Sequence, residues 1–197
     1  MKRSKNNLPA GFRLQKGITI VGSKVKLREK QLSDARHDYS WQSDAELARL
    51  DAATVLKVSF AIYLVDYTGQ LHAPKWSRFP LAVDTLDGKH IGNCSCYDVN
   101  ESRGETELGI MIGDRDYWNK GYGTDAVNTL VDYVFTNTNL RRIYLKTLDW
   151  NLRAQKCFEH CGFTSCRQIS RNGHNFVVME LKREHWQKRP KEGLKKV

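Results

Sequence analysis

The stretch that decides the fold is Trp-Asn-Lys-Gly-Tyr-Gly-Thr-Asp-Ala at residues 118–126. It follows the apolar segment 107–112, which predicts a strand, and it leads into a segment whose apolar residues recur at helical spacing. Gly121 and Gly123 carry no Cβ, so the backbone can approach a ligand closely at this turn. Because a helix N-terminus presents free N–H groups and a partial positive charge, the strand, the glycine turn and the helix start together predict a phosphate-binding site.

Two familiar nucleotide-binding motifs do not fit this turn. A Walker-type loop requires Gly-x-x-x-x-Gly-Lys-Ser/Thr, and a dinucleotide fingerprint requires a third glycine and an acidic residue about 20 residues later. Here the turn continues as a helix with one buried face, formed by Ala126, Val127, Leu130, Val131, Val134 and Phe135. The spacing then predicts a strand over 142–148 and a second helix that starts at Asn151 and ends at Gly162.

Taken together, these motifs resemble those of the GNAT superfamily of N-acetyltransferases, in the same order. They are the Glu-Leu-Gly-Ile-Met-Ile strand at 107–112, the Gly121-Tyr122-Gly123 turn, and Asn-x-x-Ala-x-x-Cys-Phe-x-x-x-Gly-Phe at 151–163. The resemblance spans residues 18–181. It implies an α/β (α+β) fold with a mixed, mostly antiparallel central sheet of about seven strands flanked by about four helices.

The segments upstream indicate a branch of that superfamily. Val-Lys-Leu-Arg at 25–28, then Asp34 and Trp41, then Ile91-Gly92, resemble the ribosomal-protein alanine and serine N-acetyltransferases. Spermidine N-acetyltransferases and some antibiotic-modifying enzymes are similar there too. We therefore expect an acetyl-CoA-dependent N-acetyltransferase that acts on a primary amine, with a protein N-terminus slightly favoured and a polyamine or aminoglycoside as the alternative.

Charge divides the chain into three parts. The net charge is +10, yet residues 1–17 hold five Lys or Arg and no acid, and residues 182–197 hold seven against two, so the body is neutral. We expect a basic N-terminal segment at 1–17, a single acetyltransferase domain at 18–181, and a basic C-terminal tail at 182–197. The two ends are either solvated or bind an acidic partner such as a ribosome or RNA. A nucleic-acid module is disfavoured for the neutral body.

Neither a membrane nor a metal is expected. The longest apolar stretch, 55–65, is interrupted by Lys57 and Ser59 and is too short to span a bilayer, and the N-terminus lacks a secretory apolar segment. We therefore expect a cytoplasmic protein. The five cysteines lack the spacing of a zinc site, so we expect reduced thiols packed as small hydrophobes. The sequence leaves both a monomer and a homodimer open.

Further elements follow from local patterns. Gly22-Ser23 predicts a hairpin between 18–21 and 24–28, and strands are expected at 81–85, 90–97, 105–112, 163–170 and 175–181. Ser33 and Asp34 are expected to cap a first helix. A capping box at 43–46 predicts a second helix, with one stripe that consists of Leu47, Leu50, Thr54, Val58, Ile62 and Val65.

Acetyl transfer to an amine requires removal of a proton, because an alkylamine with a pKa near ~10 is protonated at neutral pH. On the strand 105–112, Glu105, Glu107, Gly109 and Met111 share one face, and Leu108, Ile110 and Ile112 share the other. Members of the superfamily often use a carboxylate on this strand. By that resemblance Glu107 is the candidate base and Glu105 the second candidate, whereas an exposed strand acid without a role stays the alternative.

The resemblance also implies where acetyl-CoA binds. Main-chain groups of Ile110, Met111 and Ile112 would pair with the pantetheine arm, and the pyrophosphate would meet Lys120, Gly121, Tyr122, Gly123 and Thr124. Asn151 either contacts the cofactor arm or only caps its helix. Phe158 either packs on the pantetheine or belongs to the core.

Two departures from the superfamily pattern bear on activity. Trp118 stands where many members have Gln or Arg. Phe158 and Ala154 stand where others have a Tyr or Ser hydroxyl, so the general acid is unassigned and a catalytically weak or inactive acyl-CoA-binding protein stays open. The acceptor pocket would draw on the first helices and the last hairpin, whose candidates are Trp41, Asp44, Glu46, Tyr63, Tyr67, His72, Trp76 and His174.

Overall fold

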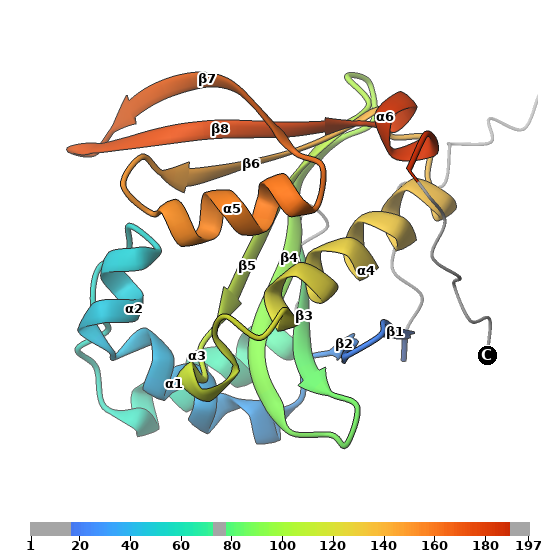
Figure 1. Ribbon diagram of the computed structural model, residues 1–197. Helices are drawn as coiled ribbons and strands as arrows, with labels where there is room; N and C mark the ends of the chain where they lie inside the picture. Colours follow the sequence, from blue (N-terminus) through green and yellow to red (C-terminus); the bar gives the residue numbers. More distant parts are fainter. Residues whose placement is uncertain (1–16, 73–77, 190–197) are drawn as a thin grey trace, which may run out of the picture.

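A single sheet organises the computed structural model, which describes residues 17–72 and 78–189 (Figure 1). Its strands run in the order β1-β2-β3-β4-β5-β6-β8-β7. Their bounds are β1 Thr19–Val21, β2 Val25–Glu29, β3 Arg78–Thr85, β4 His90–Asn100, β5 Glu105–Ile112, β6 Arg142–Leu148, β7 Thr164–Arg171 and β8 His174–Lys182. All neighbouring pairs are antiparallel except β5 and β6, which confirms the expected mixed, mostly antiparallel sheet.

The parallel pair β5–β6 is short, and it divides the sheet. Pairing joins Glu105–Glu107 only to Arg142–Tyr144, and beyond it the two strands diverge (Figure 1). A bulge in β4 between Tyr97 and Asn100, with Asp98 at φ 51°, lies beside this point. Bulges bend and twist a strand locally. The consequence is a split between the two halves of the sheet, along the free edge of β5.

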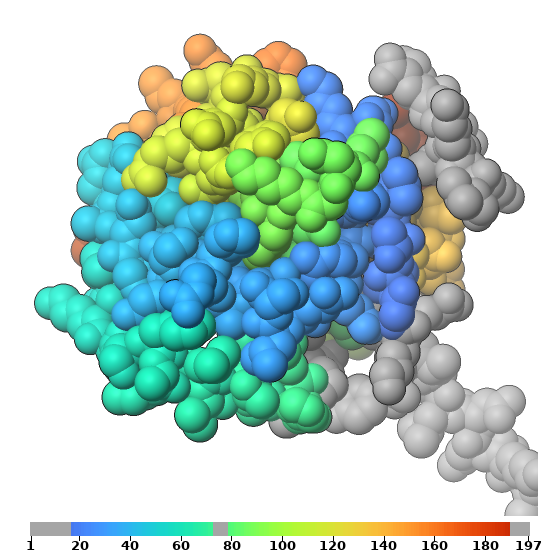
Figure 2. Space-filling view, turned by 90° about the horizontal axis from the view of Figure 1, so that it is seen from below, coloured from blue at the N-terminus to red at the C-terminus, as the bar shows by residue number. Residues whose placement is uncertain are grey.

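Three helices cover one face of the first half of the sheet: α1 (Ala35–Gln42), α2 (Ala45–Leu50) and α3 (Phe60–His72), preceded by the 3₁₀ turn η1 (Leu32–Asp34). In Figure 2 they lie together in blue to teal. Charged side chains line their contact with the sheet. The Arg28 guanidinium bonds both Asp34 and Asp84, and Lys30 pairs with Asp38. Buried charges of opposite sign therefore fix these helices on the strands.

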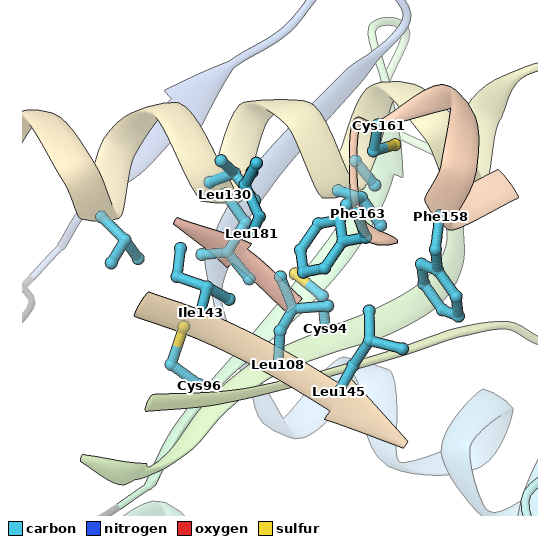
Figure 3. Packing of buried hydrophobic residues seen from close by; sticks show 14 of the residues in the cluster. Cys94, Cys96, Leu108, Leu130, Ile143, Leu145, Phe158, Cys161, Phe163 and Leu181 are labelled. Atoms are coloured by element: carbon cyan, nitrogen blue, oxygen red, sulfur yellow. The ribbon is translucent and has the colours of Figure 1, made fainter. Parts of the chain in front are cut away.

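The opposite face carries the hydrophobic core beneath α4 (Tyr122–Asn137) and α5 (Leu152–His160). The apolar face of α4 is buried as its spacing predicts. Figure 3 shows Leu130 of α4 near Ile143 and Leu181 of the strands, and Phe158 and Phe163 at the α5 end of the core. Leu108 is also buried here, and Ile110 and Ile112 pack against the same core, as predicted for these three residues of β5. None of the helices within residues 17–72 and 78–189 combines the length and apolarity needed to cross a bilayer.

The long second helix expected from residue 44 onward is wrong. It is two helices, because α2 ends at Leu50, Ala52 takes φ 50°, and the Ala53 N–H bonds the Ala48 carbonyl. The predicted stripe is consequently not buried at Val58, Ile62 and Val65, which are all exposed. The buried side of α3 presents tyrosines instead, at Tyr63 and Tyr67.

The ordered body also extends beyond residue 181, where charge alone predicted a tail. β8 reaches Lys182, and α6 (Arg183–Gln187) packs on the end of α4. The Arg183 guanidinium donates to the carbonyls of Phe135, Thr138 and Leu140 at 2.6–2.7 Å, and a cation is stabilised at a helix C-terminus. The Trp186 indole packs on Phe135 and donates to Asp132. Residues 1–16 and 190–197 lie outside the described residues.

Candidate active site

The glycine turn ends at a helix N-terminus with free donors. Gly121 is the N-cap of α4 at φ 83°, a left-handed conformation that favours glycine. The Asp125 N–H makes the first bond of the helix ladder, to the Gly121 carbonyl, so the N–H groups of residues 122–124 precede that ladder. The Asp125 carboxylate turns away and accepts from the N–H groups of residues 23–25, which fixes the turn on the β1–β2 hairpin.

A cavity of about 410 Å³ opens beside this turn. β5, the turn, α2 and α5 contribute its walls. The predicted cofactor residues that line it are Ile110, Met111, Ile112, Gly121, Gly123, Thr124, Asn151 and Phe158. Lys120 and Tyr122 do not line it: the Lys120 carbonyl accepts from Lys24 Nζ at 2.9 Å, and the Tyr122 ring packs edge-on against Tyr117.

Sequence reasoning missed the basic side of the cavity. Arg153, Lys156 and His160 all line it from α5. Their spacing of three and four residues places them on one face of a helix, and that periodicity was the available signal. Burial lowers the pKa of Arg153, although an arginine at this position stays charged. The cavity therefore combines free N–H groups with cations, as an anionic ligand requires.

Trp118 closes the β5 end of the cavity. Its Nε1–H donates to the Ile112 carbonyl at 2.7 Å, and the Arg153 guanidinium lies 3.6 Å from the ring centroid. Such a stacked cation is stabilised by the ring face. The tryptophan that replaces Gln or Arg thus holds both the last carbonyl of β5 and a cation of the cavity in place.

Asn151 and Phe158 each serve the fold as well as the cavity. The Asn151 Oδ1 accepts from the Ala154 N–H at 3.3 Å as the N-cap of α5. Phe158 is buried against Phe163, with ring centroids 6.2 Å apart. The cap and the core packing are observed, and contact of either side chain with a cofactor stays a prediction.

Glu107 lies on the face of β5 opposite Leu108 of the hydrophobic core, at the point where β5 and β6 separate. Its side chain is buried, and its Oε2 accepts from Lys146 Nζ at 2.6 Å. Lys146 lies on β6 beyond the paired residues, so this ion pair crosses the split. Burial and the nearby charge of Glu107 raise the pKa of Tyr144 to about 12. Glu105 pairs instead with Arg142 at 2.7 Å, and Arg142 also binds Glu180.

The acceptor candidates do not converge on one pocket. Trp41 is buried against Gly113, and Tyr63 and Tyr67 pack on each other in a satellite core. Asp44 and Glu46 both bind Arg115 at 2.8 Å. His72 and His174 are exposed, and Trp76 lies outside the described residues.

A second hollow of about 430 Å³ lies where α1, the β3–β4 turn and the segment around residue 115 meet. Figure 2 shows these segments side by side in blue, green and yellow. Its lining includes Trp41, Asp44, His90, Asp114 and Arg115. Each of its carboxylates already has a cationic partner, since Asp114 pairs with Lys89 and Asp44 with Arg115.

Comparison with known proteins finds relatives that cover most of the chain. The family described as acetyltransferase (GNAT) domain matches residues 24–164. The chain is 29% identical to the uncharacterized N-acetyltransferase p20 of Bacillus licheniformis over 147 residues, covering 74% of this chain and 82% of that protein. It is 28% identical to the spermidine N(1)-acetyltransferase of Escherichia coli K12 over 141 residues, covering 71% and 73%.

Among solved structures, the spermidine N-acetyltransferase of Vibrio cholerae in complex with CoA and spermine superposes with a TM-score of 0.72. It shares 21% sequence identity, and the match covers 84% of this chain and 99% of that one. The superposition shows the same fold, and the family match includes β5, the glycine turn and α5. The chain therefore belongs to the GNAT family of N-acetyltransferases.

Proposed function

We propose that this enzyme transfers the acetyl group of acetyl-CoA to a primary amine of a small polycationic acceptor, with a polyamine as the first candidate. One observation carries the proposal. β5 presents residues 110–112 to a cavity with a helix N-terminus on one side, and it carries a buried carboxylate, Glu107, where β5 and β6 separate. The split beside Glu107 is where the two sides of the sheet meet.

The cofactor fits the cavity through main-chain and basic groups. The N–H groups of residues 122–124 would bind the pyrophosphate, with Arg153 and Lys156 adding positive charge. Beyond Glu107 the edge of β5 that faces the split has no β6 partner, so main-chain groups there, other than the Ile112 carbonyl held by Trp118, are available to the amides of the pantetheine arm. Bound acetyl-CoA would supply the thioester that the amine attacks.

Glu107 would remove the proton from the acceptor ammonium, with Glu105 as the second candidate. Glu107 stands at the split, where the amine would approach the thioester. Glu105, by contrast, is held by Arg142, which also pairs with Glu180. Lys146 occupies the Glu107 carboxylate, so an incoming ammonium would displace it. No hydroxyl is present at Ala154 or Phe158, so the departing thiolate has no assigned acid.

The relatives support a small acceptor over the protein N-terminus that the upstream residues favoured. A curated relative that covers most of the domain is named a spermidine N(1)-acetyltransferase. The ribosome or RNA contact of the basic ends stays a prediction, since residues 1–16 and 190–197 lie outside the described residues. A homodimer and a cytoplasmic location also stay predictions.

The test is release of free CoA thiol from acetyl-CoA with three acceptors: spermidine, kanamycin and a peptide with an N-terminal alanine. We expect the highest kcat/KM with spermidine. A higher value with the peptide would restore the protein acceptor. Turnover with none of the three, together with CoA binding by calorimetry, would instead support an acyl-CoA-binding protein without activity, as the missing hydroxyls allow.

A further inference from the structure

Two thiols lie against the glycine turn, and one of them faces the cavity. Cys157 lines the cavity from α5, is half-buried, and places its Sγ 3.4 Å from Thr124 Oγ1. One helical turn later, Cys161 is buried and its Sγ lies 3.5 Å from the Thr124 carbonyl. Both sulfurs therefore contact the start of α4, where the free N–H groups gather. Cys157 also borders Gly123 of the turn, since a Cβ at Gly123 would lie 3.6 Å from its Sγ.

The surroundings favour the thiolate at Cys157. The neighbouring Cys161 thiol lowers the pKa of Cys157 to about 7, against burial, with further help from Thr124 and from His160 on the same helix. The proton stays on Cys161, whose pKa is raised by Cys157 and by burial, although Arg189 opposes the shift and Asp125 adds to it. A thiolate at a helix N-terminus is additionally stabilised by the helix dipole.

The other three cysteines provide internal references. Cys94 and Cys96 are buried in the core, and burial raises the pKa of both thiols. Cys166 is exposed on β7, away from the cavity, and its Sγ lies 3.4 Å from the Val178 carbonyl. Cys157 is thus the cysteine that combines access from a cavity with a second thiol one helical turn away.

We propose that Cys157 is a covalent modification site, at which low-molecular-mass disulfides with anionic groups form a mixed disulfide inside the cofactor cavity. The Cys157 proton passes to solvent, and the thiolate attacks one sulfur of the disulfide R–S–S–R. The S–S bond breaks, the bond Cys157–S–S–R forms, and the other half leaves as the thiolate R–S⁻, so no external oxidant or reductant is needed. Arg153, Lys156 and His160 line the same cavity and favour an anionic R group.

The consequence for activity rests on the proposed function. The attached R group would occupy the space beside Gly123 and Thr124, where the pyrophosphate is proposed to bind. Modification would then block acetyl-CoA, and bound CoA would shield the thiol. A thiol reductant would restore the free enzyme.

The probe is oxidised glutathione, applied to the full chain carrying Cys166→Ser so that the exposed reference thiol is removed. Intact mass should increase by one glutathionyl group, and the added Cys157→Ser substitution should abolish the increase. The rate should rise as pH passes through about 7. Cys161→Ala should slow it about 3- to 10-fold, because Cys157 loses the neighbouring thiol that lowers its pKa. Dithiothreitol should reverse the modification.

Saturating CoA separates the two ideas. If Cys157 reacts but CoA does not slow the reaction, the thiol site stands and the proposed placement of the cofactor fails. If CoA binds and turnover occurs but Cys157 reacts only in urea, the modification site is refuted and the proposed function is untouched. Equal modification with and without Cys157→Ser would also refute the site.

Discussion

The two ends of β5 differ in how their polar groups are satisfied. At the C-terminal end, residues 110–112 and the glycine turn line a cavity together with residues of α5. At the N-terminal end, carboxylates already hold cations, as in Glu107 with Lys146 and Glu105 with Arg142. One end is therefore organised to receive an anion directly, whereas the other can receive a cation only by exchanging an existing partner. Binding of the cofactor should depend on backbone shape, and handling of the amine should depend on side-chain charge.

Loss of the carboxylate at the split should have the largest effect. We expect Glu107→Gln to lower kcat by roughly ~10²-fold to ~10⁴-fold while CoA affinity is kept, because the acceptor ammonium loses its proton acceptor. The loss should shrink at high pH, where the free amine is already populated. Steady-state rates between neutral and alkaline pH measure it, with Glu105→Gln as the matched control. Activity near that of the wild type at every pH would move the role to Glu105 or to another carboxylate.

A second prediction tests whether the charged contact between the first helices and the sheet stabilises the fold. Asp34→Asn should cost about 3–5 kcal/mol of the free energy of unfolding, because Arg28 loses a buried partner. Burial acts to raise the pKa of Asp34, yet hydrogen bonds from Arg28 and the Gln31 N–H leave it below its usual value. The ionised form therefore stabilises the fold above about pH 4, and this contribution is lost as pH falls through the lowered pKa.

Urea unfolding at neutral and acidic pH checks this prediction. Asp34→Asn should flatten the acid side of the stability curve, and the exposed control Glu159→Gln should leave it unchanged. Equal acid sensitivity in Asp34→Asn and the wild type would show that other groups set it.

Binding of CoA in the cavity should depend on the shape of the glycine turn. Gly123→Val should weaken CoA binding by about 10- to 100-fold, because a side chain enters the space between backbone and phosphate. The protein itself has room for the first atom, since a Cβ there meets Cys157 and Ile112 at 3.6 and 3.7 Å. Calorimetry with CoA measures the effect, and Gly69→Val on α3, where a Cβ meets nothing within 4 Å, is the control. Unchanged affinity in folded Gly123→Val would place the phosphate elsewhere.

The smallest expected effect distinguishes the two roles of Asn151, the helix cap and contact with the cofactor. Asn151→Ala should cost about 1 kcal/mol of stability through loss of the α5 cap. Asn151→Asp keeps the cap, so its melting temperature should stay near that of the wild type. A carboxylate beside a bound diphosphate should nevertheless weaken CoA binding about 3- to 10-fold. Full CoA affinity in Asn151→Asp would reduce this residue to a cap alone.

Local pattern predicted what local physics decides. The apolar face of β5, the apolar face of α4 and the cap at Asn151 each depend on a few neighbouring residues, and all three are observed. The helix predicted from residue 44 failed because an apolar stripe does not show the left-handed turn at Ala52. The partners of Glu107 and Arg183 lie far away in the sequence, so no spacing rule could identify them.

The roles proposed for the candidate site could be named from the sequence only where a motif carries them. The glycine turn predicted where the cofactor binds, and most of the proposed cofactor residues lie around one cavity beside that turn. The acceptor candidates were chosen by residue type alone. They are dispersed. Trp41, Tyr63 and Tyr67 are buried, and Asp44 and Glu46 are paired with Arg115.

Arg183 also sets a time order for the newly made chain. The Phe135 carbonyl, in the last turn of α4, accepts from a guanidinium 48 positions later. At the speed of a ribosome, this partner is synthesised about 2–10 s after that turn. β8 lies between β6 and β7 in the sheet, yet it follows both of them in the chain. The C-terminal turn of the nascent helix therefore lacks these bonds, and β6 and β7 lack the strand that joins them, until residues 174–183 have been made.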